Sequence, residues 1–248
     1  MKLVIDFGNT LKKFALFEGN EIVKLRIVTE QEEHKLIDIV NALIKDFGSG
    51  EVKSAIISSV VNYPPGFGQF LKDRFKLIEL DQNTAVPLNN LYRSKSTLGK
   101  DRLAAAVAAR QLFPDSNVLA VVAGTCITYD VVDHQGNYLG GAISPGLDLR
   151  FRALHTFTDQ LPLMEGKAET GITGKTTADS IRSGVLNGGL AEVDGMIDKY
   201  REYYENLTII LSGGNLDHFD KKLKNNIFAV PNLVLTGLNI ILDFNELD

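Results

Sequence analysis

A short stretch near the start of the 248-residue sequence combines an acid with residues that can bind an anion. It reads Asp6-Phe7-Gly8-Asn9-Thr10, between one apolar run and a second that follows Lys13. Glycine lets the backbone approach an anion, Asn and Thr offer donors, and a carboxylate can hold a hydrated Mg²⁺. Two interpretations are open: a phosphate-binding hairpin, or a plain β-hairpin whose turn uses Gly8 and Asn9 for positive φ.

Two later turns have a similar character. Ala123-Gly124-Thr125, followed by Thr128 and Asp130, comes after an apolar run, and Ser212-Gly213-Gly214-Asn215 comes after another. Paired glycines would allow a flat ring or a ribose to lie against the backbone. Each turn alone is a weak signal. Three such turns in this order indicate a nucleotide clamp.

The stretch Leu98-Gly99-Lys100-Asp101-Arg102 precedes an Ala-rich helical segment. It could be a helix cap followed by a solvated arginine. It could instead supply a carboxylate that accepts a proton from a substrate hydroxyl, beside a guanidinium that binds an anion.

A second Gly-rich stretch, Gly140-Gly141-Ala142-Ile143-Ser144-Pro145-Gly146-Leu147, contains too much Gly and Pro for a helix. We expect either a tight turn between a strand and a helix, or backbone that packs against a substrate.

Composition narrows the class of protein. The net charge is −5 with no Lys/Arg cluster, which argues against nucleic acid and against an anionic membrane surface as partners. Cys126 is the only cysteine, and the four histidines lack ligand spacing, so neither a disulfide nor a His/Cys metal site is expected. Asp6 interrupts the first apolar run, which argues against a signal-peptide pattern. No apolar run approaches the roughly 20 residues of a membrane-spanning helix. We therefore expect a cytoplasmic protein without nucleic-acid or membrane partners.

Hydrophobic periodicity predicts an α/β fold in which one pattern occurs twice. In the first half we expect strands at 2–6, 13–18, 21–28, 54–58 and 76–80, and helices at 30–46, 67–74 and 101–112. In the second half we expect strands at 117–122, 126–132, 138–143, 207–211 and 228–230, and helices at 177–204 and 233–244.

Each half begins with a three-stranded meander and continues with βα units, which predicts two similar domains. Pro114, Asp115 and Ser116 punctuate the chain between them. We expect a phosphate- and substrate-binding domain over residues 1–115 and a nucleotide-binding domain over 116–248. Ligands of such sheets bind at strand ends and between domains, so a nucleotide cleft is expected between the two.

Taken together, these motifs resemble those of the type III pantothenate kinases, members of the acetate kinase, sugar kinase, heat-shock chaperone and actin superfamily. The motifs occur in the family's order over nearly the whole chain, including Gly-Gly-x-Ile-x-Pro-Gly at residues 140–146. The resemblance implies two ribonuclease-H-like domains. It implies a phosphotransferase acting on an alcohol group: ATP-dependent phosphorylation of pantothenate to 4′-phosphopantothenate, the first committed step towards coenzyme A. It also implies a homodimer with pantothenate near the subunit interface, and Mg²⁺ together with a monovalent cation, K⁺ or NH₄⁺.

The resemblance also assigns roles to residues. Asp101 is the implied catalytic base, and Asp6 the implied Mg²⁺ ligand, acting through water. The implied ATP contacts are Asp6, Phe7, Gly8, Asn9, Thr10, Lys13, Gly124, Thr125, Gly213, Gly214 and Asn215. The implied pantothenate contacts are Tyr92, Gly99, Lys100, Asp101, Arg102, Gly141 and Thr177.

One position departs from the family's pattern. The second phosphate motif usually reads Asp-x-Gly-Thr, with the Asp assigned to the monovalent cation, but here it reads Val122-Ala123-Gly124-Thr125. Valine offers no oxygen to a hard cation. Either other oxygens hold the cation, or the cation is not needed, or ATP binding is weakened. Two alternatives to an active pantothenate kinase therefore stay open: a nucleotide- or pantothenate-binding regulatory protein of low activity, and a kinase for another small hydroxylated acid.

Overall fold

The computed structural model describes residues 1–45, 51–166 and 170–246. The chain folds into two compact units. The N-terminal unit contains residues 1–112 together with the C-terminal segment from Asn232 onward, and the C-terminal unit contains Phe113–Pro231. Within the described ranges, no helix is long and apolar enough to cross a membrane.

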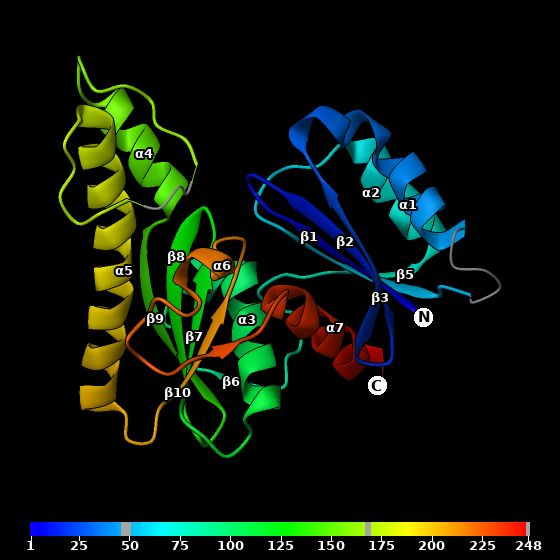
Figure 1. The fold of residues 1–248 in the computed structure, drawn as a ribbon. Coiled ribbons are helices and arrows are strands. Elements are labelled where there is room, and N and C mark those ends of the chain that lie inside the picture. Colours follow the sequence, from blue (N-terminus) through cyan, green and yellow to red (C-terminus); the bar gives the residue numbers. More distant parts are fainter. Residues whose placement is uncertain (46–50, 167–169, 247–248) are drawn as a thin grey trace. The chain divides into compact units, whose positions relative to one another are not determined.

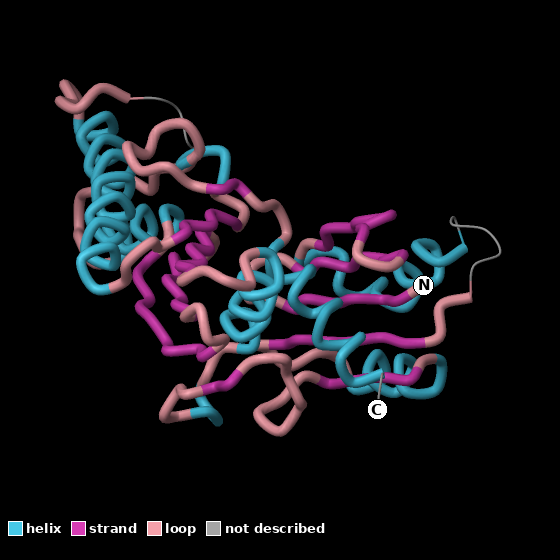
Figure 2. Tube along the Cα trace, turned by 90° about the horizontal axis from the view of Figure 1, so that it is seen from below, coloured by secondary structure: helices cyan, strands magenta, loops and turns pink. Residues whose placement is uncertain are grey.

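The N-terminal unit is built on a five-stranded mixed sheet in the order β3-β2-β1-β4-β5. The strands β1 (Lys2–Phe7), β2 (Lys12–Glu18) and β3 (Glu21–Val28) form the expected antiparallel meander. The strands β4 (Ser54–Ser59) and β5 (Lys76–Glu79) continue the sheet in parallel with β1. The tube in Figure 2 shows these strands in magenta beside the two labelled chain ends.

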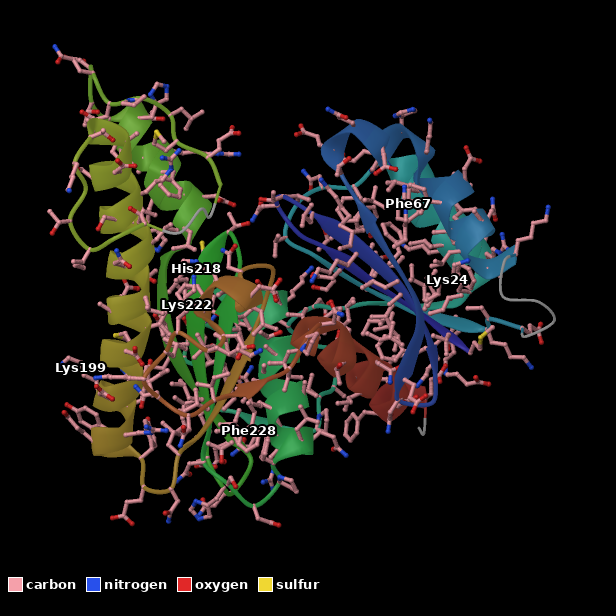
Figure 3. All side chains as sticks on the ribbon, viewed as in Figure 1. Lys24, Phe67, Lys199, His218, Lys222 and Phe228 are labelled. Carbon is pink, nitrogen blue, oxygen red and sulfur yellow. The ribbon has the colours of Figure 1, made fainter. Side chains whose placement is uncertain are left out.

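Both faces of this sheet are covered, so its central strands are apolar on both sides. The helices α1 (Leu36–Lys45) and α2 (Pro65–Arg74) pack on the face that carries Leu3, Ile5 and Phe14. Phe67 of α2, labelled in Figure 3, contacts the rings of Phe7 and Phe14 there. The helices α3 (Lys100–Leu112) and α7 (Leu233–Glu246) pack on the opposite face. Shorter elements are the 3₁₀ helices η1 (Glu30–Lys35) and η2 (Lys95–Thr97) and the strand β6 (Asn89–Asn90).

The place of α7 corrects the expected division of the chain. The sequence pattern predicts residues 232–248 as part of the second domain, whereas α7 packs in the N-terminal unit against α3, β1 and β4. The two helices approach so closely that a Cβ on Gly237 would lie 1.8 Å from the carbonyl oxygen of Ala104. Lys2 also bonds Asp243 at 2.6 Å. An amphipathic pattern predicts that a helix packs on a core, but it does not say on which of two cores.

The C-terminal unit repeats the same topology. Its strands β7 (Val118–Ala123), β8 (Cys126–Val132) and β9 (Asn137–Pro145) form an antiparallel meander. The strands β10 (Thr208–Ser212) and β11 (Phe228–Ala229) run parallel to β7, which gives the order β11-β10-β7-β8-β9 for the strands of this unit. Read from the meander side, the five strands that each unit contributes to its own sheet have the order 3-2-1-4-5 with the same directions. The expected α/β fold with two ribonuclease-H-like domains is therefore confirmed.

Three helices accompany this sheet: α4 (Leu147–Thr156), the long α5 (Thr177–Tyr203) and the short α6 (Leu216–Phe219). In Figure 1, α5 runs along one side of this unit beside α4. The core lies between the sheet and these helices, where Val121 and Tyr129 meet Phe151 and Val193.

Several local expectations need correction. Within the stretch 140–147, β9 continues to Pro145 and α4 begins at Leu147, so the turn between strand and helix is confined to Gly146; the strand is longer than expected, and the helix 147–156 is not among the predicted segments. The expected helix 30–46 begins as a 3₁₀ segment, and its last residue lies outside the described residues. Among the described residues with positive φ, neither Gly8 nor Asn9 occurs, so positive φ does not explain the first turn.

Candidate functional site

In the N-terminal unit, three polar residues lie in a row across neighbouring strands. Asp6 of β1 is directly opposite Lys13 of β2 and directly opposite Ser58 of β4. Residues that are directly opposite share one face of a sheet. Two residues away along each strand on the same face, Val4, Ala15 and Ile56 are buried against α3 and α7. The row Lys13–Asp6–Ser58 is therefore the polar end of an apolar core.

Asp6 is partly buried, and its surroundings favour the protonated form. Burial raises the pKa of Asp6 to about 6, and the negative charge of Asp101 adds to this, while Lys13 acts in the opposite direction. An acid with a strongly raised pKa near a second carboxylate is a candidate for a functional role. A bound cation would favour the ionised form.

The hairpin between β1 and β2 contains Gly8, Asn9, Thr10 and Leu11, and the last three of these are exposed. A Cβ on Gly8 would lie 2.9 Å from the carbonyl oxygen of Leu11, so close approach of the backbone explains this glycine. Asn9 and Thr10 are exposed residues, as a phosphate-binding turn requires.

Two adjacent lysines point to opposite faces of the sheet. Lys12 is buried on the face of α1 and α2, where it pairs with Glu33 and lies over the ring of Phe7 at 5.6 Å from the centroid. Lys13 faces Asp6, and its ammonium donates to Oδ1 of Asn232 at 3.4 Å. The sheet thus gives Lys12 a structural partner and leaves Lys13 beside the acid.

The helix α3 begins within the stretch Gly99–Arg102. The N–H of Leu103 donates to the carbonyl of Gly99 at 3.1 Å, and the N–H of Arg102 donates to Oδ1 of Asp101 at 2.9 Å. A Cβ on Gly99 would lie 2.6 Å from Oδ1 of Asp101, so a side chain here would displace that carboxylate. Glycine at this position therefore preserves the orientation of Asp101 beside Asp6.

Arg102 is not a solvated arginine, contrary to one of the two sequence interpretations. It is only 5% exposed, and its guanidinium lies over the ring of Tyr92, 5.6 Å from the centroid. The structure thereby brings together two residues, ten positions apart, that both belong to the predicted substrate set. An arginine fixed on an aromatic ring has a defined direction in which to bind a carboxylate.

Two cavities border this region of the N-terminal unit. The larger, of about 810 Å³, is lined by Asn89, Asn90, Lys95, Leu98 and Lys100 among others. The smaller, of about 490 Å³, is lined by residues 59–63 and Lys100. Lys100 borders both, so this predicted substrate residue is accessible from either side.

In the C-terminal unit, the second and third turns meet through backbone contacts. The N–H of Asn215 donates to the carbonyl of Ala123 at 2.9 Å, and its Nδ2 donates to the carbonyl of Gly124 at 3.2 Å. The N–H of Gly146 donates to the carbonyl of Thr125 at 3.0 Å. Three predicted motifs of this unit are thus assembled around residues 123–125.

The glycines of this assembly have different reasons to be there. Gly213 has a φ of +103°, and a Cβ on it would lie 2.3 Å from the carbonyl oxygen of Ala123. A Cβ on Gly146 would lie 2.1 Å from the carbonyl oxygen of Gly124. Gly213 and Asn215 therefore fix the turn, and Gly214 is exposed with open space where a side chain would lie.

Val122 lies on β7 directly opposite Thr128 of β8 and Ser212 of β10. Its side chain shares a face with two hydroxyl groups and no carboxylate in those positions. Asp130 is two residues further along β8, but it is fully buried and accepts a hydrogen bond from Tyr138 at 2.7 Å. The residues around position 122 therefore do not fit a monovalent cation held by a carboxylate.

A polar network that the motifs do not include supports the end of β9. Glu192 of α5 accepts hydrogen bonds from Ser144 and from Arg150, both at 2.5 Å, and Arg150 also donates to the carbonyl of Pro145 at 2.8 Å. Burial raises the pKa of Glu192, but the hydrogen bonds from Ser144 and Arg150 outweigh it, and the net pKa lies below its ordinary value. These residues hold the stretch before Gly146 against α5.

Two remaining predicted substrate residues lie in the C-terminal unit. Gly141 sits in β9, where a Cβ would lie 1.6 Å from the carbonyl oxygen of Tyr129, so strand packing alone requires a glycine. Thr177 is the first residue of α5 and is exposed, next to the cap residue Thr176, whose hydroxyl accepts from the N–H of Asp179 at 3.1 Å.

The donors near Asp6 fit a cation that keeps most of its own water. In the described part of the chain, no three His, Cys, Asp or Glu side chains gather into a metal-binding group. Mg²⁺ is commonly held by one or two carboxylates together with substrate phosphates and waters. Asp6, with Asp101 close enough to perturb it, offers oxygen ligands of this kind.

Comparison with known proteins identifies the relatives of this chain. The family model described as type III pantothenate kinase matches residues 2–199. A type III pantothenate kinase of Christiangramia forsetii is 42% identical over 246 residues, covering 99% of each chain. Another, of Phocaeicola vulgatus, is 43% identical over 247 residues with the same coverage.

Solved structures share the fold at low identity. A Baf family protein of Campylobacter jejuni matches with a TM-score of 0.59 and 18% identity, covering 99% of this chain and all of the other. The inorganic polyphosphate/ATP-glucomannokinase of Arthrobacter sp. strain KM matches with a TM-score of 0.50 and 14% identity, covering 98% of each chain. The structural likeness supports the fold, and the sequence likeness supports more: this chain belongs to the type III pantothenate kinase family.

Proposed function

We propose that this chain transfers the terminal phosphoryl group of ATP to the hydroxyl of pantothenate, forming 4′-phosphopantothenate on the route to coenzyme A. Membership of the family supports the reaction. One observation carries the assignment to residues: Asp6 at the end of β1 and Asp101 in the first turn of α3 lie near enough for their charges to interact. Phosphoryl transfer needs such groups, because it depends on alignment and on neutralising charge.

In this proposal the first hairpin receives the phosphates. Asn9 and Thr10 donate to phosphate oxygens, Gly8 and Phe7 contribute backbone, and the ammonium of Lys13 lies beside them. In the C-terminal unit, the turn Gly124-Thr125 binds nucleotide phosphate. Gly214, which Gly213 and Asn215 hold in place, contacts the nucleoside. The exposure of Asn9, Thr10 and Gly214 supports these roles.

Pantothenate is a carboxylate with amide and hydroxyl groups, and the predicted pantothenate contacts supply partners for these groups. Arg102, oriented by Tyr92, binds the carboxylate, and the accessible Lys100 adds positive charge. Asp101 accepts the proton of the hydroxyl that attacks the phosphoryl group. Gly99 keeps the Asp101 carboxylate in place. Gly141 and Thr177 are further proposed contacts, with backbone and hydroxyl respectively.

A divalent cation, when bound, would neutralise charge on the phosphates. Asp6 would hold it through water, which fits its position beside the hairpin and the oxygen donors there. We also propose that residue 122 supplies no charged ligand to a monovalent cation, because Val122 has only Thr128 and Ser212 opposite it.

Asp101→Asn tests the proposal. Turnover should fall roughly 10²–10⁴-fold, the usual value of a positioned base, while ADP still binds. Asp38 is an exposed aspartate in the first turn of α1, so Asp38→Asn is a matched control that should keep wild-type turnover. Near-normal turnover of Asp101→Asn would remove Asp101 from the mechanism.

A coupled assay of ADP release with and without pantothenate separates the remaining alternatives. Pantothenate-dependent release supports the proposed kinase. Release that requires a different hydroxylated acid would identify another substrate. Nucleotide binding without release would indicate a regulatory protein.

We also propose that the chain forms a homodimer and that it is a cytoplasmic protein. Two large apolar side chains of the C-terminal unit, Phe157 and Ile172, are 85% and 82% exposed in the single chain, which favours a subunit contact. Measurement of the molar mass in solution by light scattering tests this: a mass near 27 kDa would contradict the dimer.

A further inference from the structure

Ser58 has a buried hydroxyl that the fold does not use. Its side chain is 0% exposed, and in the described part of the chain its Oγ has no hydrogen-bond partner. Buried hydroxyl groups are almost always paired, because an unpaired one loses its hydrogen bonds to water without replacement. The neighbouring Ser59 shows the ordinary situation, since its Oγ is bonded to both the carbonyl and the N–H of Val61.

The place of Ser58 relates this hydroxyl to the site. It lies directly opposite Asp6, on the face that also carries Lys13, at the ends of the parallel strands β4 and β1. Ile56, two residues earlier on the same face, is apolar and buried, as an ordinary core position would be. An apolar residue would satisfy packing at position 58 equally well, so packing does not explain the serine.

We infer that Ser58 is a positioning residue for the divalent cation: its hydroxyl bonds a water in the hydration shell of the cation beside Asp6. This inference depends on the proposed function only in the use of a cation with the nucleotide. A hydroxyl can donate to the Asp6 carboxylate or accept from a metal-bound water, so it matches a hydrated cation better than it matches a bare anion. Lys13 and Ser58 then flank Asp6 on its two sides, one with charge and one with a hydrogen bond.

The test is ADP binding measured by calorimetry, with Mg²⁺ at varied concentration and with EDTA. Ser58→Ala should raise the Mg²⁺ concentration needed for half-maximal tightening of ADP binding roughly tenfold, the value of one lost hydrogen bond. Affinity for ADP in EDTA should stay within twofold of wild type. Ser58→Cys, which keeps the side-chain size with a weaker donor, should lie between the two.

Ser54 provides a matched control. It is a buried serine on the same strand and the same face, four residues away at the other end of β4. Ser54→Ala should leave the Mg²⁺ dependence unchanged. In an Asp6→Asn background the Ser58→Ala substitution should add no further loss, because the cation is no longer held there.

Three results with Ser58→Ala would overturn the inference: an unchanged Mg²⁺ dependence, an equal loss of ADP affinity in EDTA, or a full further loss in the Asp6→Asn background. None of these measurements uses pantothenate. If wild type fails to phosphorylate pantothenate, the proposed function fails separately. If Asp6→Asn itself leaves the Mg²⁺ dependence unchanged, the cation is held elsewhere and the role of Ser58 falls with it.

Discussion

The guanidinium of Arg102 lies 5.6 Å from the centre of the Tyr92 ring, and Arg102 is almost completely buried. The contact joins the first turn of α3 to the segment between β6 and η2. It gives the arginine a fixed direction, because a planar guanidinium stacks on a ring in a way that an ammonium does not.

This contact predicts unequal effects of conservative substitutions. Arg102→Lys should raise the KM for pantothenate roughly 10–100-fold, since a lysine loses the two-point grip on a carboxylate. Tyr92→Leu should raise KM more than Tyr92→Phe, because phenylalanine keeps the ring face. Steady-state kinetics on the three variants provides the check. Equal effects of the two Tyr92 variants would show that the ring does not orient Arg102.

Asp6 predicts a dependence of stability on pH. Burial, together with Asp101, raises the pKa of Asp6 from 3.8 to about 6. Between these pH values the unfolded chain has lost a proton that the folded chain keeps, so this group makes stability fall as pH rises through that window. Asp6→Asn should therefore be more stable than wild type at pH 7, by up to about 3 kcal/mol, and nearly equal at pH 4.

Chemical denaturation of wild type and Asp6→Asn at pH 4, 5, 6 and 7, without nucleotide or Mg²⁺, measures this difference. The same variant should lose activity, so function and stability would be opposed at this residue. A variant less stable than wild type at pH 7 would contradict the assigned direction of the pKa.

The adjacent lysines predict a separation of activity from stability. Lys13→Met should lower ATP affinity and turnover with little change in the free energy of unfolding, because Lys13 faces the site. Lys12→Met should lower the free energy of unfolding by roughly 1 kcal/mol, because Glu33, which is partly exposed, loses its ion-pair partner. Activity and denaturation measured on both variants decide the matter, and the reverse pattern would mean that the site is on the other face.

Much of this arrangement could be predicted from the sequence. The strand and helix segments, the repeated meander and the turns after β1, β7 and β10 follow from local patterns of apolar residues and glycines. The two lysines show where such patterns stop. Successive residues of β2 point to opposite faces of the sheet, but both faces are buried, so the sequence alone does not say which lysine faces the site.

Other features depend on contacts between distant residues. Gly237 fits against the carbonyl of Ala104 only once α7 and α3 are packed together, and nothing near Gly237 in the sequence specifies that partner. The proposed role of Ser58 depends on the strand register that places it opposite Asp6, and no local pattern specifies that register. The bond between Glu192 and Ser144 spans 48 positions and has no local signal. Register and tertiary packing, rather than propensity, determine these relationships.

Glu192 predicts the opposite pH behaviour to Asp6. Its pKa is lowered in the folded chain, so its contribution to stability is present above the ordinary glutamate pKa and is lost as pH falls below it. Glu192→Gln should cost about 1–3 kcal/mol at pH 7, the value of hydrogen bonds to a charged group, and less at pH 4. The exposed Glu202→Gln on the same helix should change stability by less than about 0.5 kcal/mol. Equal stability of Glu192→Gln and wild type at pH 7 would show that the network does not hold β9 to α5.

Val122 predicts an altered response to monovalent cations. Its neighbours across the sheet are Thr128 and Ser212, so the site offers K⁺ hydroxyl and carbonyl oxygens but no charge from residue 122. A single charge near a cation, at an effective dielectric of about 20, is worth on the order of a few kcal/mol. Wild type should therefore need unusually high K⁺ or show no response to it.

Val122→Asp should introduce activation by K⁺ at millimolar concentration and lower the ATP concentration needed for saturation. Val122→Asn, of similar size but uncharged, is the matched control and should show little activation. ATP saturation curves in K⁺ and in Na⁺ for the three proteins make the comparison. Strong activation of wild type by low millimolar K⁺, unchanged in Val122→Asp, would mean that other residues hold the cation and that residue 122 has no part in it.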